Sequence, residues 1–69
     1  MADHVYKKLE LVGSSTTSID EAIKTAISKT DESVKNMRWF EVQQIRGEIA
    51  DGNVAHFQVT VKVGFTIEV

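Results

Sequence analysis

The sequence predicts a small α+β domain in which a three-stranded antiparallel sheet, with strand order 1-3-2, wraps around one helix. Two kinds of pattern support this fold class. Apolar and polar residues alternate in three segments, which is typical of strands. Between the first and second of these segments, apolar residues recur every three or four positions, as they do on one face of a helix. The resulting order is β-α-β-β, and we expect residues 1–69 to form a single domain.

The first strand is expected over residues 5–12, and a polar connector follows it over residues 13–17. Ser18 then stands three positions before Glu21, which is the spacing of a capping box at the start of a helix. In that motif the Glu21 N–H donates to the Ser18 hydroxyl, and the Ser18 N–H donates to the Glu21 carboxylate. We expect the helix to cover residues 19–36 and to stop at Asn36. Its buried stripe consists of Ile19, Ala22, Ile23, Ala26, Ile27, Thr30, Val34 and Met37.

The second strand is expected over residues 39–49, but its alternation breaks in the middle. Phe40 and Val42 share one parity, whereas Ile45 and Ile49 share the other. A β-bulge near the two glutamines between these pairs would put all four side chains on the core side of the sheet.

A strong hairpin turn, Asp51-Gly52-Asn53, precedes the third strand. There the alternation is unbroken over about 13 residues, more than twice the usual strand length. The hairpin makes the last two strands antiparallel neighbours, and the helix returns the chain to the same end of the sheet, which favours the order 1-3-2. The helix covers one face and leaves the other open, with two unpaired edges. The core-facing residues of the third strand are Phe57, Val59, Val61, Val63, Phe65, Ile67 and Val69.

A chain of 69 residues without cysteine has few means of stabilising itself. A core of this size rarely supplies more than about 3–5 kcal/mol, and disulfides are excluded, so we expect a homo-oligomer. Eight basic against ten acidic residues give a net charge of −2, which offers no reason to bind bare nucleic acid or anionic lipid. No segment resembles a membrane span or a secretory signal, which favours a cytoplasmic location.

Trp39 is the residue whose position most needs an explanation. It directly precedes Phe40 and therefore lies on the open face of the sheet. A large apolar ring at such a place is buried in a subunit interface, stacks on a planar ligand or is merely exposed, and the residues leave these readings open. Gly64 is expected nearby on the same face, where its missing side chain leaves room for a ring.

A small polar group is expected beside the hairpin on the same open face. The Gln58 carboxamide can read the edge of a heterocycle, and the Arg46 guanidinium suits a phosphate, although a solvated sheet face has the same composition. Gln58 lies about six residues, or roughly 20 Å, from the position opposite Trp39, so a ligand shared by both requires a subunit interface. Glu48 and His56 complete the group. The sequence has no carboxylate pair, catalytic triad or metal cluster, so we expect neither an enzyme nor a metal site.

Four segments of the chain resemble the dodecins: YKKLELVGSS at residues 6–15, WFEV at 39–42, IRG at 45–47 and HFQV at 56–59. Each segment is weak alone, but their combination is specific and spans nearly the whole chain. The resemblance implies a flavin-binding protein that forms a hollow homododecamer and holds flavins in pairs across two-fold axes. It also implies roles for three residues: stacking on the isoalloxazine ring (Trp39), hydrogen bonding to the ring edge (Gln58) and contact near the flavin phosphate (Arg46).

Around Gln44 and Arg46 the sequence resembles the bacterial dodecins, and this resemblance favours FMN over riboflavin, lumichrome or FAD. Some bacterial dodecins also resemble coenzyme A binders, so coenzyme A stays a second ligand class. The implied role is flavin storage and photoprotection, in which an indole quenches the excited flavin. The alternatives are a structural oligomer without a ligand and a flavin-dependent enzyme.

Overall fold

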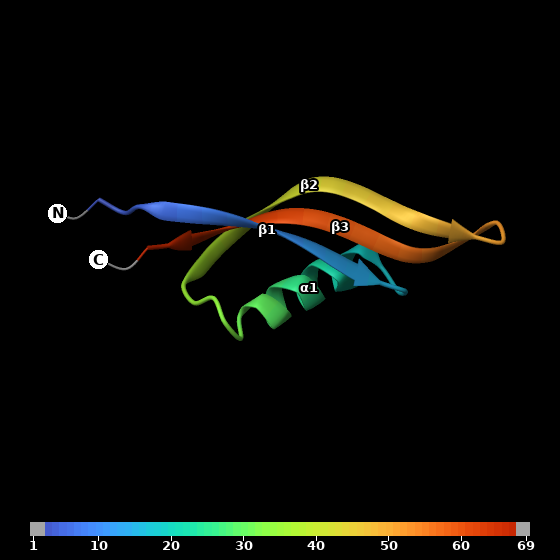
Figure 1. The fold of residues 1–69 in the computed structure, drawn as a ribbon, viewed down its shortest axis with the longest axis horizontal. Coiled ribbons are helices and arrows are strands. Elements are labelled where there is room, and N and C mark those ends of the chain that lie inside the picture. Colours follow the sequence, from blue (N-terminus) through green and yellow to red (C-terminus); the bar gives the residue numbers. More distant parts are fainter. Residues whose placement is uncertain (1–2, 68–69) are drawn as a thin grey trace.

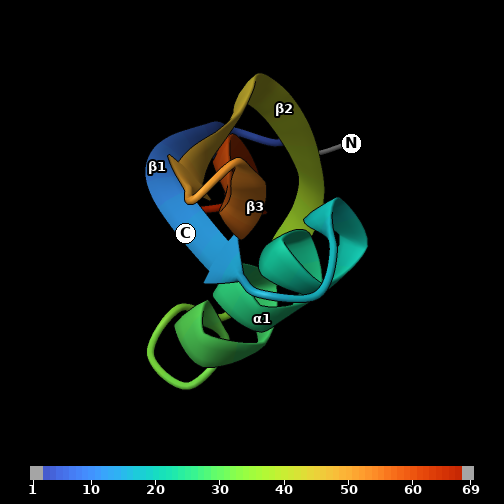
Figure 2. The ribbon, with the colours of Figure 1, turned by 90° about the vertical axis from the view of Figure 1, so that its right-hand side faces the viewer.

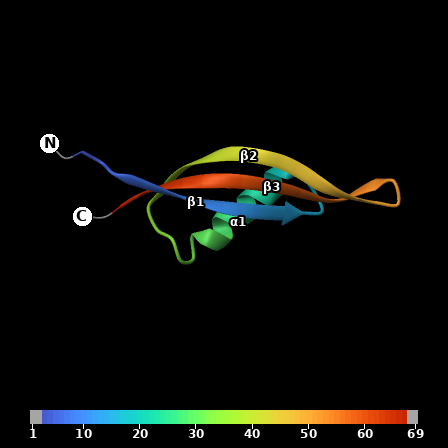
Figure 3. The same ribbon diagram turned by 45° about the horizontal axis from the view of Figure 1, so that its top comes forward.

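The computed structural model describes residues 3–67 and has the element order β1 (Tyr6–Ser15), α1 (Ile19–Thr30), β2 (Met37–Ala50) and β3 (Asn53–Thr66). The strands form one antiparallel sheet in the order β1-β3-β2, as Figure 3 shows. The helix lies against one face of this sheet (Figures 1 and 2). The predicted fold class and strand order are therefore confirmed. Within residues 3–67, no helix has the length and apolar character needed to cross a membrane.

The core lies between α1 and the middle of β3. Val59, Val61 and Val63 of β3 and Ala22 of α1 are fully or almost fully buried. Each such valine stabilises the fold by roughly 1.5–3 kcal/mol relative to an exposed position. The partly buried residues around this core are Leu9, Leu11, Ile19, Ile23 and Met37. The alternation of the third strand thus identifies Val59, Val61 and Val63 correctly, whereas Phe57 and Phe65 are only half-buried and Ile67 is exposed.

The helix begins as predicted, but its cap differs from a full capping box. The Ser18 hydroxyl accepts from the Glu21 N–H at 3.0 Å. The predicted return bond to the Glu21 carboxylate is wrong, because the Ser18 N–H donates to the Ser15 hydroxyl at 3.3 Å. The end of β1 therefore supplies the acceptor and ties the strand directly to the helix.

The helix ends at Thr30, so the predicted end at Asn36 is wrong. The Thr30 hydroxyl donates to the Ala26 carbonyl at 2.8 Å, and the Ser33 and Val34 amides both turn back to the Thr30 carbonyl. Residues with short polar side chains favour such turns over a continuing helix. Asn36 instead adopts a left-handed conformation, with φ of 66°, directly before β2. The six residues after the helix are needed to return the chain to the sheet.

Strand β1 runs three residues further than predicted, to Ser15, and so includes three of the five residues of the expected connector. The reason lies at Gly13, which is buried and pairs with Val59. A Cβ atom at this position would lie 2.1 Å from the backbone oxygen of Ala22. Glycine therefore lets the strand continue in close contact with the helix backbone.

The hairpin of β2 and β3 contains the predicted bulge, and both of its strands begin earlier in the chain than predicted. The register of β2 against β3 shifts between Val42 and Gln44, as the broken alternation predicted. Asp51 and Gly52 both have positive φ, which defines the two-residue turn. Because the turn is so tight, β3 already begins at Asn53. The strand ends at Thr66. The predicted continuation of this strand through Glu68 and Val69 lies outside the described residues.

The helix covers less of the sheet than predicted, because it packs on β1 and β3 and leaves β2 uncovered (Figure 2). Phe40, Val42 and Ile45 lie on the helix side, yet they are 47%, 43% and 56% exposed. Ile49, near the hairpin tip, is exposed as well. The prediction that these four residues belong to the core is therefore wrong for the single chain.

The close contact at Gly13 gives a stability prediction. Gly13→Ala should destabilise the protein by about 1–3 kcal/mol, because the strand or the helix must shift to admit the methyl group. The matched control is Ser14→Ala on the exposed side of the same strand. Urea unfolding at a fixed chain concentration measures both variants. Equal midpoints for Gly13→Ala and Ser14→Ala would contradict this account of the contact.

Candidate functional site

The three predicted site residues lie on the open face of the sheet, opposite the helix. The register pairs Trp39 with Gly64 and Arg46 with Gln58. Both pairs alternate with positions whose side chains face α1, such as Val59 and Val63. The prediction that these side chains share the uncovered face is therefore confirmed.

The indole of Trp39 lies flat on the backbone of Gly64. A Cβ atom built on Gly64 would lie 2.3, 2.4 and 2.5 Å from three consecutive ring atoms, Cζ2, Cη2 and Cε2. Nearly equal distances to three neighbouring atoms mean that the ring face, rather than its edge, covers the glycine. The other face of the indole is consequently directed away from the sheet. Trp39 remains 37% exposed.

Two further contacts fix the orientation of this indole. The Tyr6 ring meets it in a T-shaped arrangement, with centroids 5.1 Å apart and an interplanar angle of 75°. The indole Nε1–H donates to Glu41 Oε2 at 2.8 Å. That same carboxylate oxygen lies 2.8 Å from Lys8 Nζ. The Lys8 and Trp39 hydrogen bonds hold the pKa of Glu41 below its ordinary value of 4.5.

A second polar cluster occupies the other end of the open face, close to the hairpin. Arg46 Nε donates to Gln58 Oε1 at 2.9 Å, which leaves the terminal guanidinium nitrogens without a partner among residues 3–67. Beside this pair, His56 Nδ1 lies 2.9 Å from Glu48 Oε1. The predicted polar group of four residues is therefore present as two adjacent pairs.

Within one chain, the two ends of the open face do not meet. Gln58 is six positions along β3 from Gly64, which corresponds to roughly 20 Å in an extended strand. An isoalloxazine ring is far shorter than this span. A single ligand that contacts both Trp39 and Gln58 therefore needs a second copy of the chain.

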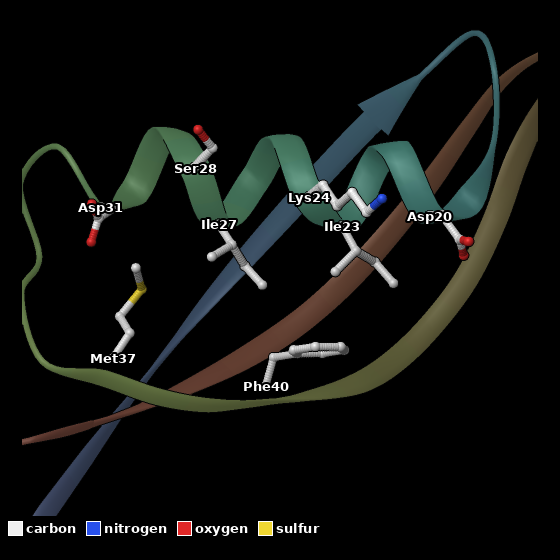
Figure 4. Close-up of a pocket in the computed structure, with 8 residues that line it drawn as sticks. All are labelled: Asp20, Ile23, Lys24, Ile27, Ser28, Asp31, Met37 and Phe40. Carbon is white, nitrogen blue, oxygen red and sulfur yellow. The ribbon is translucent and has the colours of Figure 1, made fainter.

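An apolar groove lies on the opposite side of the sheet, between α1 and β2. It has a volume of about 540 Å³. Ile23 and Ile27 point into it from the helix, and Met37 and Phe40 point into it from β2 (Figure 4). Of its charged residues, Asp20 and Lys24 belong to the helix, and Asp31 is the residue that caps the C-terminal end of the helix. This groove is mainly apolar, which suits packing against another protein surface better than binding a phosphorylated ligand.

Sequence reasoning missed Glu41 and Lys8 as neighbours of the indole. The Trp39-x-Glu41 spacing placed both side chains on one face of a strand, so the first contact had a detectable signal. The second contact depends on the register of β1, which pairs Lys8 with Gly64 across from Trp39. That register cannot be read from alternation alone.

Comparisons with known proteins give a consistent result. The sequence model of the dodecin family matches residues 5–68. The dodecin of Thermus thermophilus is 42% identical over 64 residues, which cover 93% of each chain. The solved dodecin of Streptomyces davaonensis superimposes with a TM-score of 0.94 at 40% identity, covering 99% of this chain and 100% of that one. The dodecin of Streptomyces coelicolor gives a TM-score of 0.94 at 42% identity, covering 100% and 99%.

Proposed function

The chain belongs to the dodecin family, and on this premise we propose that it stores FMN and protects the cell from the excited state of that flavin. In this proposal, a homododecamer sequesters FMN in stacked pairs. Trp39 stacks on the isoalloxazine ring, Gln58 binds the ring edge and Arg46 binds the phosphate. The bound flavin supplies a planar, photoexcitable electron acceptor.

The geometry of Trp39 is the observation that carries the proposal. One face of the indole rests on Gly64, and its N–H is already bonded to Glu41. The outward face is thus held ready at a fixed angle on an uncovered sheet. A planar aromatic ligand can stack there without first reorganising the side chain, which limits the entropy lost on binding.

The Arg46–Gln58 pair supports FMN as the flavin. Gln58 uses its oxygen toward Arg46 and keeps its amide group available to donate to a ring carbonyl. The terminal guanidinium nitrogens form a planar fork that matches phosphate geometry. Riboflavin lacks a phosphate, and so it would gain nothing from this fork. Coenzyme A also carries phosphates and stays the second candidate ligand.

Assembly into a homododecamer is supported by what a single chain leaves exposed. The groove between α1 and β2 and the uncovered side chains of Phe40, Val42 and Ile45 form a continuous apolar region. Exposed apolar surface of this kind is typical of subunit interfaces. The separation of Trp39 from Gln58 gives a second reason for assembly, because only neighbouring copies can bring both to one ring.

The proposed role is protective rather than catalytic. An indole stacked on an excited flavin can donate an electron and receive it back, which returns both partners to their starting state. No substrate is consumed in this cycle. Turnover of a reductant by the FMN-loaded protein would favour the flavin-dependent enzyme instead.

Removing the indole should separate binding from quenching. Trp39→Ala should weaken FMN binding about 5- to 150-fold, the range expected when one aromatic stacking partner is lost. Trp39→Phe keeps a ring to stack on but is a poorer electron donor, so it should retain more affinity and yet leave bound FMN fluorescent. Equilibrium dialysis measures binding, and fluorescence of the bound fraction measures quenching. Wild-type affinity and quenching in Trp39→Ala would refute the assignment.

Arg46→Ala should discriminate between two flavins. FMN affinity should fall about 10- to 100-fold with the loss of charge-assisted bonds to the phosphate, whereas riboflavin affinity should change by less than about threefold. The matched control is Arg38→Ala, which removes the same charge from the same strand, where Arg38 bonds only to Thr66 among residues 3–67. An equal loss for FMN and riboflavin in Arg46→Ala would mean that Arg46 acts through Gln58 rather than on the phosphate.

A further inference from the structure

An ion pair holds the N–H side of the Trp39 indole. Glu41 Oε2 accepts both the indole Nε1–H and the ammonium group of Lys8, each at 2.8 Å. The three residues come from two different strands, and the sheet register brings them together around Gly64. A full negative charge therefore lies within hydrogen-bond distance of the ring nitrogen.

We propose that Glu41 is a positioning residue for Trp39 that also sets how readily the indole gives up an electron. The inference rests on the proposed function, because the natural acceptor would be the photoexcited isoalloxazine ring of FMN. Glu41 itself does not reach the stacking face, since it approaches the indole through its N–H.

The physical effect is electrostatic. When one electron leaves the indole, the ring becomes positively charged and its N–H becomes a stronger donor. The Glu41 carboxylate already accepts this N–H, so it stabilises the new charge without moving. When the electron returns to Trp39, the neutral indole and the original hydrogen bond are restored. One electron leaves and one returns, and no bond is formed or broken.

The charges around Glu41 determine when this effect operates. Lys8 on β1 and Lys62 on β3 favour its ionised form, with Lys8 making the larger contribution. Glu10 on β1 lies opposite Lys62 in the same row of the sheet. Tyr6, also on β1, contacts the indole rather than the carboxylate. With a pKa below 4.5, Glu41 is ionised at neutral pH, and its support for the indole is lost only as the pH falls through that lowered value.

The apoprotein allows a test without flavin, because the chain has a single tryptophan. A freely diffusing ruthenium polypyridyl photo-oxidant would oxidise Trp39, and transient absorption would give the rate. Glu41→Gln should slow this oxidation about tenfold, in line with the strength of a charge-assisted hydrogen bond. Glu10→Gln removes the same charge from the same row of the sheet without touching the indole, and it should stay within about twofold of wild type.

The pH profile separates an electrostatic role from a purely structural one. The wild-type oxidation rate should fall at a pH below 4.5. The Glu41→Gln rate should show no such step. Lys8→Met should move the step to higher pH, because it removes the largest cause of the lowered Glu41 pKa. An unchanged rate and an unchanged pH profile in Glu41→Gln would overturn the inference.

The FMN-loaded protein then connects this effect to quenching. With each protein saturated with FMN, as checked by equilibrium dialysis, the excited-state lifetime of bound FMN should be about tenfold longer in Glu41→Gln than in the wild type. An unchanged lifetime would overturn the inference and leave the proposed function intact. If the wild-type protein binds no FMN, the proposed function fails, and the oxidation rates of the apoprotein still decide the role of Glu41.

Discussion

One short helix cannot cover this sheet, and most features of the protein follow from that constraint. Helix α1 has 12 residues and is about 18 Å long, whereas β2 and β3 have 14 residues each and extend over about 48 Å. The helix covers the middle of β3 and part of β1, where the core valines lie. Strand β2 and the entire opposite face stay uncovered. A single chain therefore leaves two regions uncovered, and these regions have different chemistry.

The region beside the helix is apolar, whereas the open face carries the aromatic and polar side chains of the candidate site. Strand β3 connects the two, because its alternate side chains form the core and the floor of the candidate site. Val63 packs under the helix, and the next residue, Gly64, supports the indole of Trp39. The order 1-3-2 also gives this central position two neighbours, so Glu41 of β2 bonds to the indole and Lys8 of β1 pairs with Glu41. The candidate site is consequently a product of sheet register.

Alternation predicted much of this arrangement. It identified the bulge between Val42 and Gln44 and the open-face positions of Trp39, Arg46 and Gln58, and the hairpin together with the returning helix gave the sheet order. It failed where local polar bonds or backbone contacts decide. Thr30 ends the helix through bonds to its own last turn, and Gly13 continues a strand because the helix backbone lies against it. Parity assigned Phe40 to the helix side, but it could not reveal that the helix leaves β2 exposed.

In the proposed assembly, copies of this chain together form the flavin site. An FMN titration, followed by flavin fluorescence on protein whose mass is determined by light scattering in the same buffer, tests it most directly. We expect strong quenching that saturates near one FMN per chain, on a particle of about twelve chains. Strong quenching by a monomer would contradict the shared site. An oligomer that leaves FMN fluorescent at saturating protein would reduce Trp39 to an interface residue and leave a structural assembly without a flavin.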